Sequence, residues 1–333
     1  MSSNTYQQVL TLLPSLSSEE QERLKKWLQN NPSISLQDLV CIKENQGIAC
    51  PECGEIEHLV KYGRNSAGVQ RYHCTECNVT FTPLSYTLLS NSNKELSVWL
   101  SYIDCMINGL SIRKSAKICG ISVRTAFFWR HKILDILRMK LKRIKLKGII
   151  ECDDTFFRES YKGNCPPNRE SYKRGTSASK RGISEEQICV STAIDRNGKV
   201  YGKVSARGRA NSKEIKKAIG ARIDKQAIIC TDDDSAYKRF AKDKHLEHVI
   251  VKEHETVKGV YHINTINAYH ARLKIFIKRF KGVASKYLDN YLAWLNSIGE
   301  RKLTLGQVIK SSIKEDCVDI GWQTIKNRPL MPV

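Results

Sequence analysis

Two groups of carboxylates accompany apolar stretches that are typical of β-strands. Asp153 lies in the stretch "GIIECDDTFF", and Asp232 directly follows the later stretch "AIICT". In a mixed sheet these strands can be neighbours, and like charges a few ångströms apart repel strongly unless a cation lies between them. Hard divalent cations prefer oxygen ligands, and two such ions can hold the attacking and leaving oxygens of a phosphodiester in line. The alternative, helix capping by "DDDS", suits Asp234 or Ser235 but does not account for Asp153.

A third contribution to this chemistry is predicted from the helix over residues 264–280. Ile266, Tyr269 and Leu273 belong to its buried stripe, whereas Asn267 and Lys274 are seven residues apart and therefore share another face. An amide oxygen can complete a metal shell, and a lysine two turns further along can hold a phosphate. A solvated face is the alternative for this pair.

Four cysteines have the spacing of a zinc ribbon. Two C-x2-C pairs are separated by 20 residues, and they consist of Cys50, Cys53, Cys74 and Cys77. Four thiolates fill a tetrahedral shell, so we expect a structural zinc ion and not a catalytic one. Gly54 would supply a turn, and Tyr62, Tyr72 and Phe81 a minimal core. Four unrelated buried cysteines are the alternative.

The stretch "LSIRKSAKICGISVRTAFFWRHKILDIL" has the small-residue and glycine spacing of a helix-turn-helix. Ala116 is expected where the two helices touch and Gly120 at the turn, with Val123 and Ile133 as core contacts of the second helix. That helix would offer a set of polar, basic and aromatic side chains to DNA, namely Arg124, Thr125, Phe128, Arg130, His131 and Lys132. An ordinary helical pair with a solvated basic face is the alternative.

The composition indicates the partner. The chain of 333 residues carries 55 Lys and Arg against 34 acidic residues, a formal charge of +21, with a pI near 9.5. This balance favours nucleic acid as the partner, with a membrane surface as the weaker alternative. No apolar stretch approaches the roughly 20 residues that span a bilayer. We therefore expect a cytoplasmic protein associated with the nucleoid.

The positioning elements predict an α/β fold. From residue 148 the pattern runs through three strands, a helix, a strand, a helix, a strand and a closing helix, with a hairpin turn at Asn197-Gly198. The expected organisation is a helical arm over 1–45, a zinc ribbon over 46–90, a helix-turn-helix domain with a basic linker over 91–147, a catalytic domain over 148–300 and a tail over 301–333.

Two further basic segments are expected to neutralise DNA phosphates. One is the Pro-, Gly- and Ser-rich loop over 162–182, and the other is the run over 272–286. Their candidate DNA contacts are Lys173, Arg174, Lys180, Arg181, Lys278 and Arg279.

These motifs in this order resemble a known family. The zinc ribbon, the helix-turn-helix, "ECDDTFF", "CTDDDSAY" and "HINTINAYHARLK" are similar to prokaryotic insertion-sequence transposases with an N-terminal zinc ribbon and an RNase H-like DDE domain, in the branch with an Asp, Asp, Asn, Lys signature. The resemblance covers about residues 45–300. It implies that Asp153, Asp232 and Asn267 hold Mg²⁺ or Mn²⁺ and that Lys274 is the signature lysine.

The implied activity is DNA strand cleavage and strand transfer at terminal inverted repeats by a homodimer or larger homo-oligomer. Two positions depart from the commoner pattern of the family. Asn267 stands in place of Glu, and Asp233 in place of Gly, either as an auxiliary carboxylate or as a sign of a decayed copy. An inactive DNA-binding regulator and an RNase H-like nuclease remain alternative functions.

Overall fold

The computed structural model describes residues 16–21, 35–90, 92–163, 179–252, 257–299, 308 and 322–329. The chain divides into two compact units, one of residues 1–110 with 303–319 and one of residues 111–302 with 320–333. Of the helical arm predicted over residues 1–45, residues 16–21 and 35–45 are described, with helix at residues 18–21 and 36–44. In the described part of the chain, no helix combines the length and apolar character needed to cross a membrane.

The first unit contains a small antiparallel sheet, which follows one helix and precedes another in chain order. Ser35 caps the first helix and accepts a hydrogen bond from the Asp38 amide, while the Asp38 carboxylate accepts one from the Ser35 amide. The sheet order is β1-β2-β3. The elements are α3 (Leu36–Glu44), β1 (Leu59–Arg64), β2 (Gln70–Cys74), β3 (Thr80–Phe81) and α4 (Leu96–Ile107).

The second unit begins with the predicted helical pair, α5 (Ile112–Ile118) and α6 (Val123–Leu141). Ser111 and Ser122 cap the two helices, and Gly120 in the turn has a φ of +61°, which favours glycine. Ala116 and Ile133 are buried as expected. The expectation for Val123 was wrong, because its side chain is 50% exposed at the first turn of α6.

Helix α6 packs against α10 (Leu288–Gly299), within the same unit. The Arg130 guanidinium lies 4.9 Å from the Trp294 ring centroid, and the His131 ring lies 4.1 Å from the Tyr287 ring. These contacts join α6 to the second unit, whose boundary with the first unit lies between residues 110 and 111. This boundary falls inside the segment over 91–147 that was predicted to form one domain.

A five-stranded mixed sheet forms the centre of the second unit, in the order β6-β5-β4-β7-β8. Strand β5 is antiparallel to β4 and β6, while β7 is parallel to β4 and β8. The elements follow the predicted succession: β4 (Ile149–Arg158), β5 (Gln187–Asp195), β6 (Val200–Arg207), α7 (Ser212–Ala218), β7 (Ile228–Thr231), α8 (Ser235–Lys244), β8 (Glu247–Ile250) and α9 (Asn264–Arg279). The expected mixed α/β architecture is confirmed.

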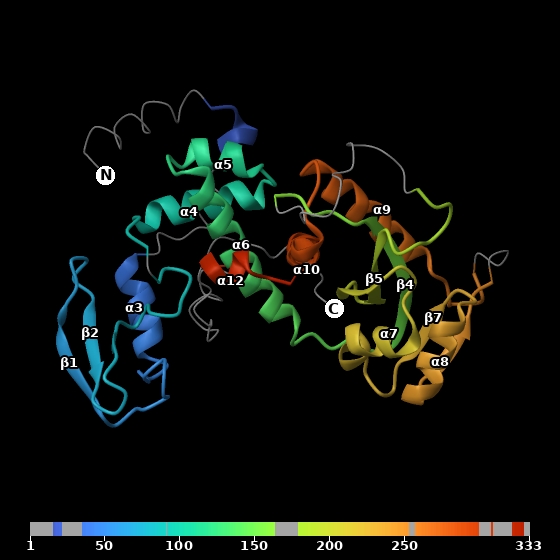
Figure 1. The fold of residues 1–333 in the computed structure, drawn as a ribbon, viewed down its shortest axis with the longest axis horizontal. Helices are drawn as coiled ribbons and strands as arrows, with labels where there is room; N and C mark the ends of the chain where they lie inside the picture. The colour runs from blue at the N-terminus through green and yellow to red at the C-terminus, as the bar shows by residue number, and fades with distance from the viewer. Residues whose placement is uncertain are drawn as a thin grey trace. The chain divides into compact units, whose positions relative to one another are not determined.

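Helices cover both faces of the sheet (Figure 1). Successive side chains along a strand therefore point alternately into two hydrophobic cores. On β5, Cys189 and Ala193 join Tyr237 and Phe240 of α8 in one core. Ile188, Val190 and Ile194 face the other way, into a core with α9 and α10. Residues of β4 are sorted in the same way, and this sorting decides which of its acids faces α9.

Candidate functional site

The parallel pairing of β4 with β7 brings the two predicted aspartates together. Ile149, Ile150 and Glu151 pair with Ile228, Ile229 and Cys230. The same register, continued by two residues, sets Asp153 beside Asp232. Asp153 in β4 and Asp232, directly after the end of β7, therefore lie close together at the same level of the sheet, as the sequence indicated.

Alternation along β4 distinguishes Asp153 from its neighbour Asp154. Asp154 faces α8, where its Oδ1 accepts a hydrogen bond of 2.6 Å from the Tyr237 hydroxyl. Asp153 faces α9, where its Oδ2 lies 3.4 Å from Nδ1 of His270. Of the two adjacent acids in "ECDD", only Asp153 lies on the face of the sheet that is covered by α9, the helix that carries Asn267.

The electrostatic environment of Asp232 also indicates a shared site. Partial burial raises the pKa of the Asp232 carboxyl, and the negative charge of Asp153 raises it further, with smaller effects from Asp234 and Asp154. Two neighbouring acids that disfavour each other's ionised form are typical of a site that binds a cation. The carboxylates of Asp153 and Asp232 fit a hard divalent cation in charge and in ligand type.

Helix α9 carries the other predicted residues on one stripe. Asn267, His270 and Lys274 are three and four residues apart, so they follow one another along the same side of the helix. His270 is 6% exposed and touches Asp153, whereas Asn267 and Lys274 are exposed. The contact of His270 therefore orients the stripe toward Asp153 and leaves Asn267 and Lys274 accessible to a substrate.

His270 was not predicted as a site residue, although it lies in the segment "HINTINAYHARLK" and one turn after Asn267. Glu151, which is 1% exposed on β4, was not predicted either. The Glu151 Oε2 accepts a hydrogen bond of 2.9 Å from the amide of Ile266, in the first turn of α9. The signal for Glu151 was its spacing of two residues from Asp153, which places both side chains on one face of the strand.

Glu151 also forms an ion pair with Arg196 at the end of the β5–β6 hairpin. The Arg196 guanidinium donates to the carbonyl of Val260 at 3.1 Å and lies 2.9 Å from Nε2 of His262. A carboxylate near the N-terminus of a helix is stabilised by the helix dipole. Glu151 and Arg196 thus fix the position of the first turn of α9 relative to β4. They thereby also fix the position of Asn267 along the strand.

The other acids of "TDDDS" have separate partners. Asp234 caps α8 by accepting a hydrogen bond from the Ala236 amide, and it pairs with Arg209 at 3.0 Å. Asp233 is exposed and pairs with Lys238 at 2.5 Å, which lowers the pKa of its carboxyl. The capping role expected for Asp234 is confirmed, and Asp233 is engaged with α8.

The four predicted cysteines form one cluster in the first unit. Their sulfurs lie within 4.8 Å of one another, with Sγ separations of 3.4 Å for Cys50 and Cys77 and 3.6 Å for Cys53 and Cys74. A tetrahedral zinc site with Zn–S bonds of about 2.3 Å needs sulfurs roughly 3.8 Å apart. The cluster therefore has the composition and size of a zinc site.

The two cysteine knuckles have matching backbones. The amide of Gly54 donates to the Cys50 carbonyl and the amide of Asn78 to the Cys74 carbonyl, both at 2.9 Å. Gly54 and Asn78 have φ of +79° and +63°, respectively. Burial opposes ionisation of Cys50, but hydrogen bonds from the Cys53 and Glu52 amides outweigh it and lower its pKa to about 7.

The small core beside the cysteines differs from the prediction in one residue. Tyr72 and Phe81 stack at 5.9 Å as part of this core. Tyr62 was expected to join them but is exposed on β1, where its ring lies against Arg71.

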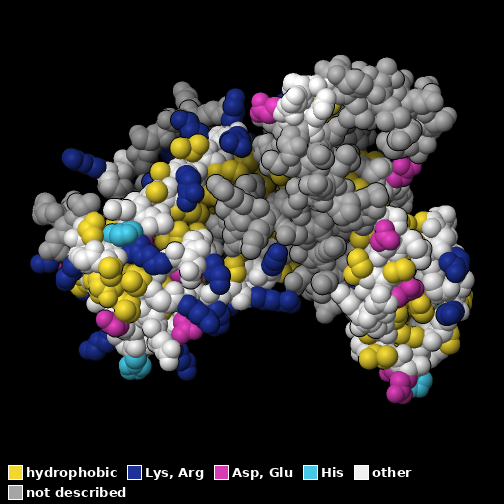
Figure 2. Space-filling model, turned by 180° about the vertical axis from the view of Figure 1, so that it is seen from behind, with side chains coloured by type: hydrophobic (Ala, Val, Ile, Leu, Met, Phe, Trp, Pro, Cys, Tyr) yellow, Lys and Arg dark blue, Asp and Glu magenta, His cyan; other side chains and the backbone are white. Residues whose placement is uncertain are grey.

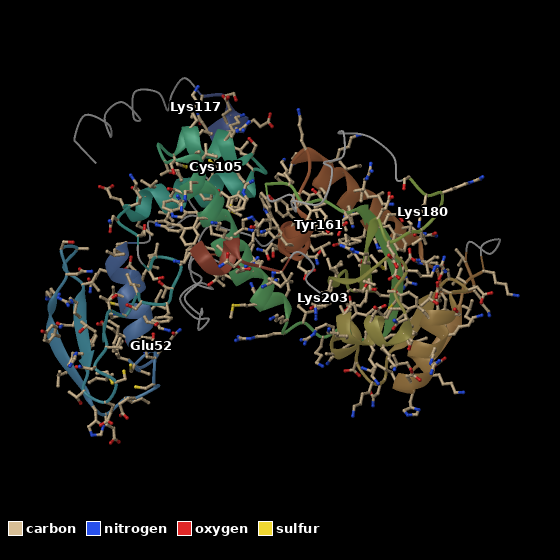
Figure 3. All side chains as sticks on the ribbon, viewed as in Figure 1. Glu52, Cys105, Lys117, Tyr161, Lys180 and Lys203 are labelled. Carbon is tan, nitrogen blue, oxygen red and sulfur yellow. The ribbon has the colours of Figure 1, made fainter. Side chains whose placement is uncertain are left out.

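The residues predicted to contact DNA fall into three groups. Arg124, Lys180, Arg181, Lys278 and Arg279 are exposed, and Thr125 is partly exposed at the start of α6. Lys180 can be found in Figure 3. Lys173 and Arg174 lie outside the described residues.

The third group requires a correction. Arg130 and His131 are each 1% exposed and Lys132 is 4% exposed. Arg130 stacks on the rings of Trp294 and Phe280, and the Lys132 ammonium lies 5.8 Å from the Phe128 ring. These side chains are buried and do not present the surface that a DNA contact requires.

Part of the chain matches a family of known proteins. Residues 145–296 match the family model of the ISXO2-like transposase domain. Over 259 residues the chain is 26% identical to an uncharacterized protein in transposable element ISH50 of Halobacterium salinarum, covering 76% of this chain and 86% of the relative. The expected resemblance to insertion-sequence transposases is confirmed.

Two solved structures of Mos1 assemblies have partial similarity to the chain. The chain in a pre-cleavage Mos1 transpososome is 12% identical, with a TM-score of 0.21, over 64% of this chain and 78% of that one. The Mos1 strand transfer complex gives 12% identity and a TM-score of 0.22, over 68% and 81% of the two chains.

Proposed function

We propose that the chain is the transposase of an insertion sequence, which cleaves DNA at the ends of the element and joins the freed ends to target DNA. The observation that carries the proposal is the placement of Asp153 and Asp232 side by side on parallel strands beneath the Asn267, His270 and Lys274 stripe of α9. The match to a transposase domain over residues 145–296 supports it. The strand order and the single antiparallel strand between β4 and β6 fit an RNase H-like domain.

In this proposal the side chains have separate roles. Asp153, Asp232 and the amide oxygen of Asn267 bind divalent cations, and Lys274 holds a phosphate of the DNA. His270 contacts Asp153 and keeps its carboxylate turned toward α9. Mg²⁺ or Mn²⁺, when bound, would supply Lewis-acid stabilisation of the charge that develops on the phosphate oxygens.

The N-terminal parts would hold the DNA. We infer that the Cys50, Cys53, Cys74 and Cys77 cluster binds structural zinc and that the zinc ribbon and the α5–α6 pair recognise the terminal inverted repeats. Arg124 and Thr125 are placed at the exposed start of α6, as a recognition helix requires. Lys173, Arg174, Lys180, Arg181, Lys278 and Arg279 would neutralise phosphates, and joining two ends requires a homodimer or larger assembly.

The proposal is tested by DNA nicking with purified protein, Mn²⁺ and a duplex that contains one end of the element. Asp153→Asn and Asp232→Asn should each lower the cleavage rate at least about 100-fold, which corresponds to roughly 3 kcal/mol of lost transition-state stabilisation. Asp233→Asn is the matched control, because it makes the same change at the residue next to Asp232. This variant should cleave at nearly the wild-type rate, since Asp233 is paired with Lys238.

The alternative functions give different results in the same assay. A protein that binds the end but cuts it under no metal condition is a regulator. A protein that cuts without joining the end to target DNA is a nuclease.

A further inference from the structure

A second charged site lies at the edge of the sheet, away from the paired aspartates. It is a pocket of about 320 Å³ between the C-terminal half of α6, strand β6, the start of α10 and the chain after α12 (Trp322–Lys326). All of its lining residues belong to the second unit. Strand β5 separates β6 from β4, so the pocket shares no residue with the candidate active site. Lys203, which lines the pocket, can be found in Figure 3.

Cations from four segments line this pocket. They are Arg138 of α6, Lys142 directly after α6, Lys203 of β6, Lys286 just before α10, and Arg328. Asp289 is the acid among the lining residues that the structure describes. Figure 2 shows that Lys and Arg side chains also predominate over acids on the face of this unit that is seen from behind.

The acids near the pocket are already engaged. Asp289 is buried, and its Oδ1 accepts a hydrogen bond of 2.8 Å from the Val204 amide. Asp135, which is buried on α6, pairs with Arg328 and lies 3.5 Å from Arg138. These two carboxylates offset part of the charge of the five cations, and a positive excess remains in a concave site.

The basic side chains of the pocket are only partly engaged: the Lys286 ammonium donates to the Lys326 carbonyl at 3.0 Å, and Asp135 pairs with Arg328 and lies near Arg138. Nη1 of Arg328 and Nε of Arg138 are buried without a hydrogen-bond acceptor in the part of the chain that the structure describes. The Lys286 side chain is buried, and burial, followed by the positive charge of Arg328, lowers its pKa. Guanidinium and ammonium groups that converge in this way match the oxygens of a phosphate.

We propose that this pocket binds backbone phosphates of DNA and anchors the duplex away from the reacting bond. The proposal rests on the proposed function in its choice of DNA as the ligand. The exposed Lys142 and the partly exposed Lys203 lie where a strand could approach from solvent. The guanidinium of Arg328 and the ammonium of Lys286, which are more buried, would receive the phosphate oxygens.

The test compares two variants that lose the same charge. Lys142→Gln/Lys203→Gln removes two accessible pocket cations, and Lys213→Gln/Lys217→Gln removes two exposed cations of α7. Duplex binding is measured by fluorescence anisotropy between 50 and 200 mM salt, in EDTA, with end-containing and random duplexes. Each lost phosphate contact lowers the slope of log K against log salt by about 0.9. The pocket variant should lose about 1.8 of this slope, and the α7 variant should keep the wild-type value.

A lysine acylation footprint gives a second readout. DNA should protect Lys142 and Lys203 but not Lys213 and Lys217. Equal slopes in the two variants, or protection of Lys203 by millimolar inorganic phosphate and not by DNA, would overturn the pocket proposal. If the wild-type protein cleaves DNA in a metal-dependent way and the two variants have equal slopes, only the pocket proposal is refuted. Wild-type protein that never cleaves, while the slopes differ as expected, refutes only the transposase function.

Discussion

Replacing Glu151 by glutamine should loosen the first turn of α9 without removing either paired aspartate. In the wild type, the Glu151 carboxylate accepts a hydrogen bond from the Ile266 amide at 2.9 Å and forms an ion pair with Arg196. Glutamine has the same shape and retains one acceptor oxygen. It loses the negative charge that both contacts use.

The magnitude follows from these two contacts. A hydrogen bond to a charged group contributes roughly 1.5–3 kcal/mol and a neutral one about 1, so the bond to Ile266 weakens by about 0.5–2 kcal/mol. Arg196 is partly exposed, so its lost attraction adds on the order of 1 kcal/mol. The local opening free energy of α9 should therefore fall by about 1.5–3 kcal/mol. Amide hydrogen exchange there should become roughly 10- to 150-fold faster.

The assay is hydrogen exchange with mass spectrometry on peptides that cover residues 264–270. Glu159→Gln is the matched control, because Glu159 is a buried acid just after β4 and pairs with Arg207 of β6. It should leave exchange in α9 unchanged. If α9 exchanges at the wild-type rate in Glu151→Gln, Glu151 does not hold the helix and the positioning argument fails.

Other consequences concern the zinc cluster and helix α6. Cys50→Ser should abolish the binding of one zinc ion per chain, measured by mass spectrometry of the metal content, and the exposed Cys41→Ser should not; zinc retained in both would contradict the cluster. Because burial lowers the pKa of His131 well below 6.5, the unfolded chain takes up a proton that the folded chain refuses. Wild-type stability should thus fall by up to about 1.4 kcal/mol per pH unit below pH 6.5 from this group, and thermal or urea unfolding of His131→Gln should show a correspondingly shallower loss. Arg124→Ala should lower the salt slope of DNA binding by about 0.9, whereas Arg130→Ala should leave the slope unchanged and lower the unfolding free energy by about 2–3 kcal/mol; the reverse outcome would restore Arg130 as a DNA contact.

The pairing of Asp153 with Asp232 could be predicted from the sequence because it depends on local pattern. Both acids accompany apolar stretches with the length and composition of buried strands, and the succession of elements limits which strands can be neighbours. The buried stripe of α9 was predicted for the same reason: Ile266, Tyr269 and Leu273 recur at helical spacing and are buried.

The position of the basic residues on α6 could not be predicted in this way. Charged side chains are usually exposed, so Arg130 and Lys132 were expected to face DNA. The ring that covers the Arg130 guanidinium belongs to Trp294 of α10, far along the chain. The contact of His270 with Asp153 and that of Glu151 with Ile266 are equally non-local, and they appear only when α9 lies against β4.

The central claim, that Asp153 and Asp232 share a divalent cation, is tested most directly by anomalous X-ray diffraction from crystals soaked in Mn²⁺. We predict a manganese peak about 2.0–2.2 Å from a carboxylate oxygen of each aspartate, on the side of the sheet that faces α9, and its loss in Asp232→Asn crystals. Carboxylates that point to opposite faces of the sheet, or a manganese peak that contacts neither of them, would contradict the account.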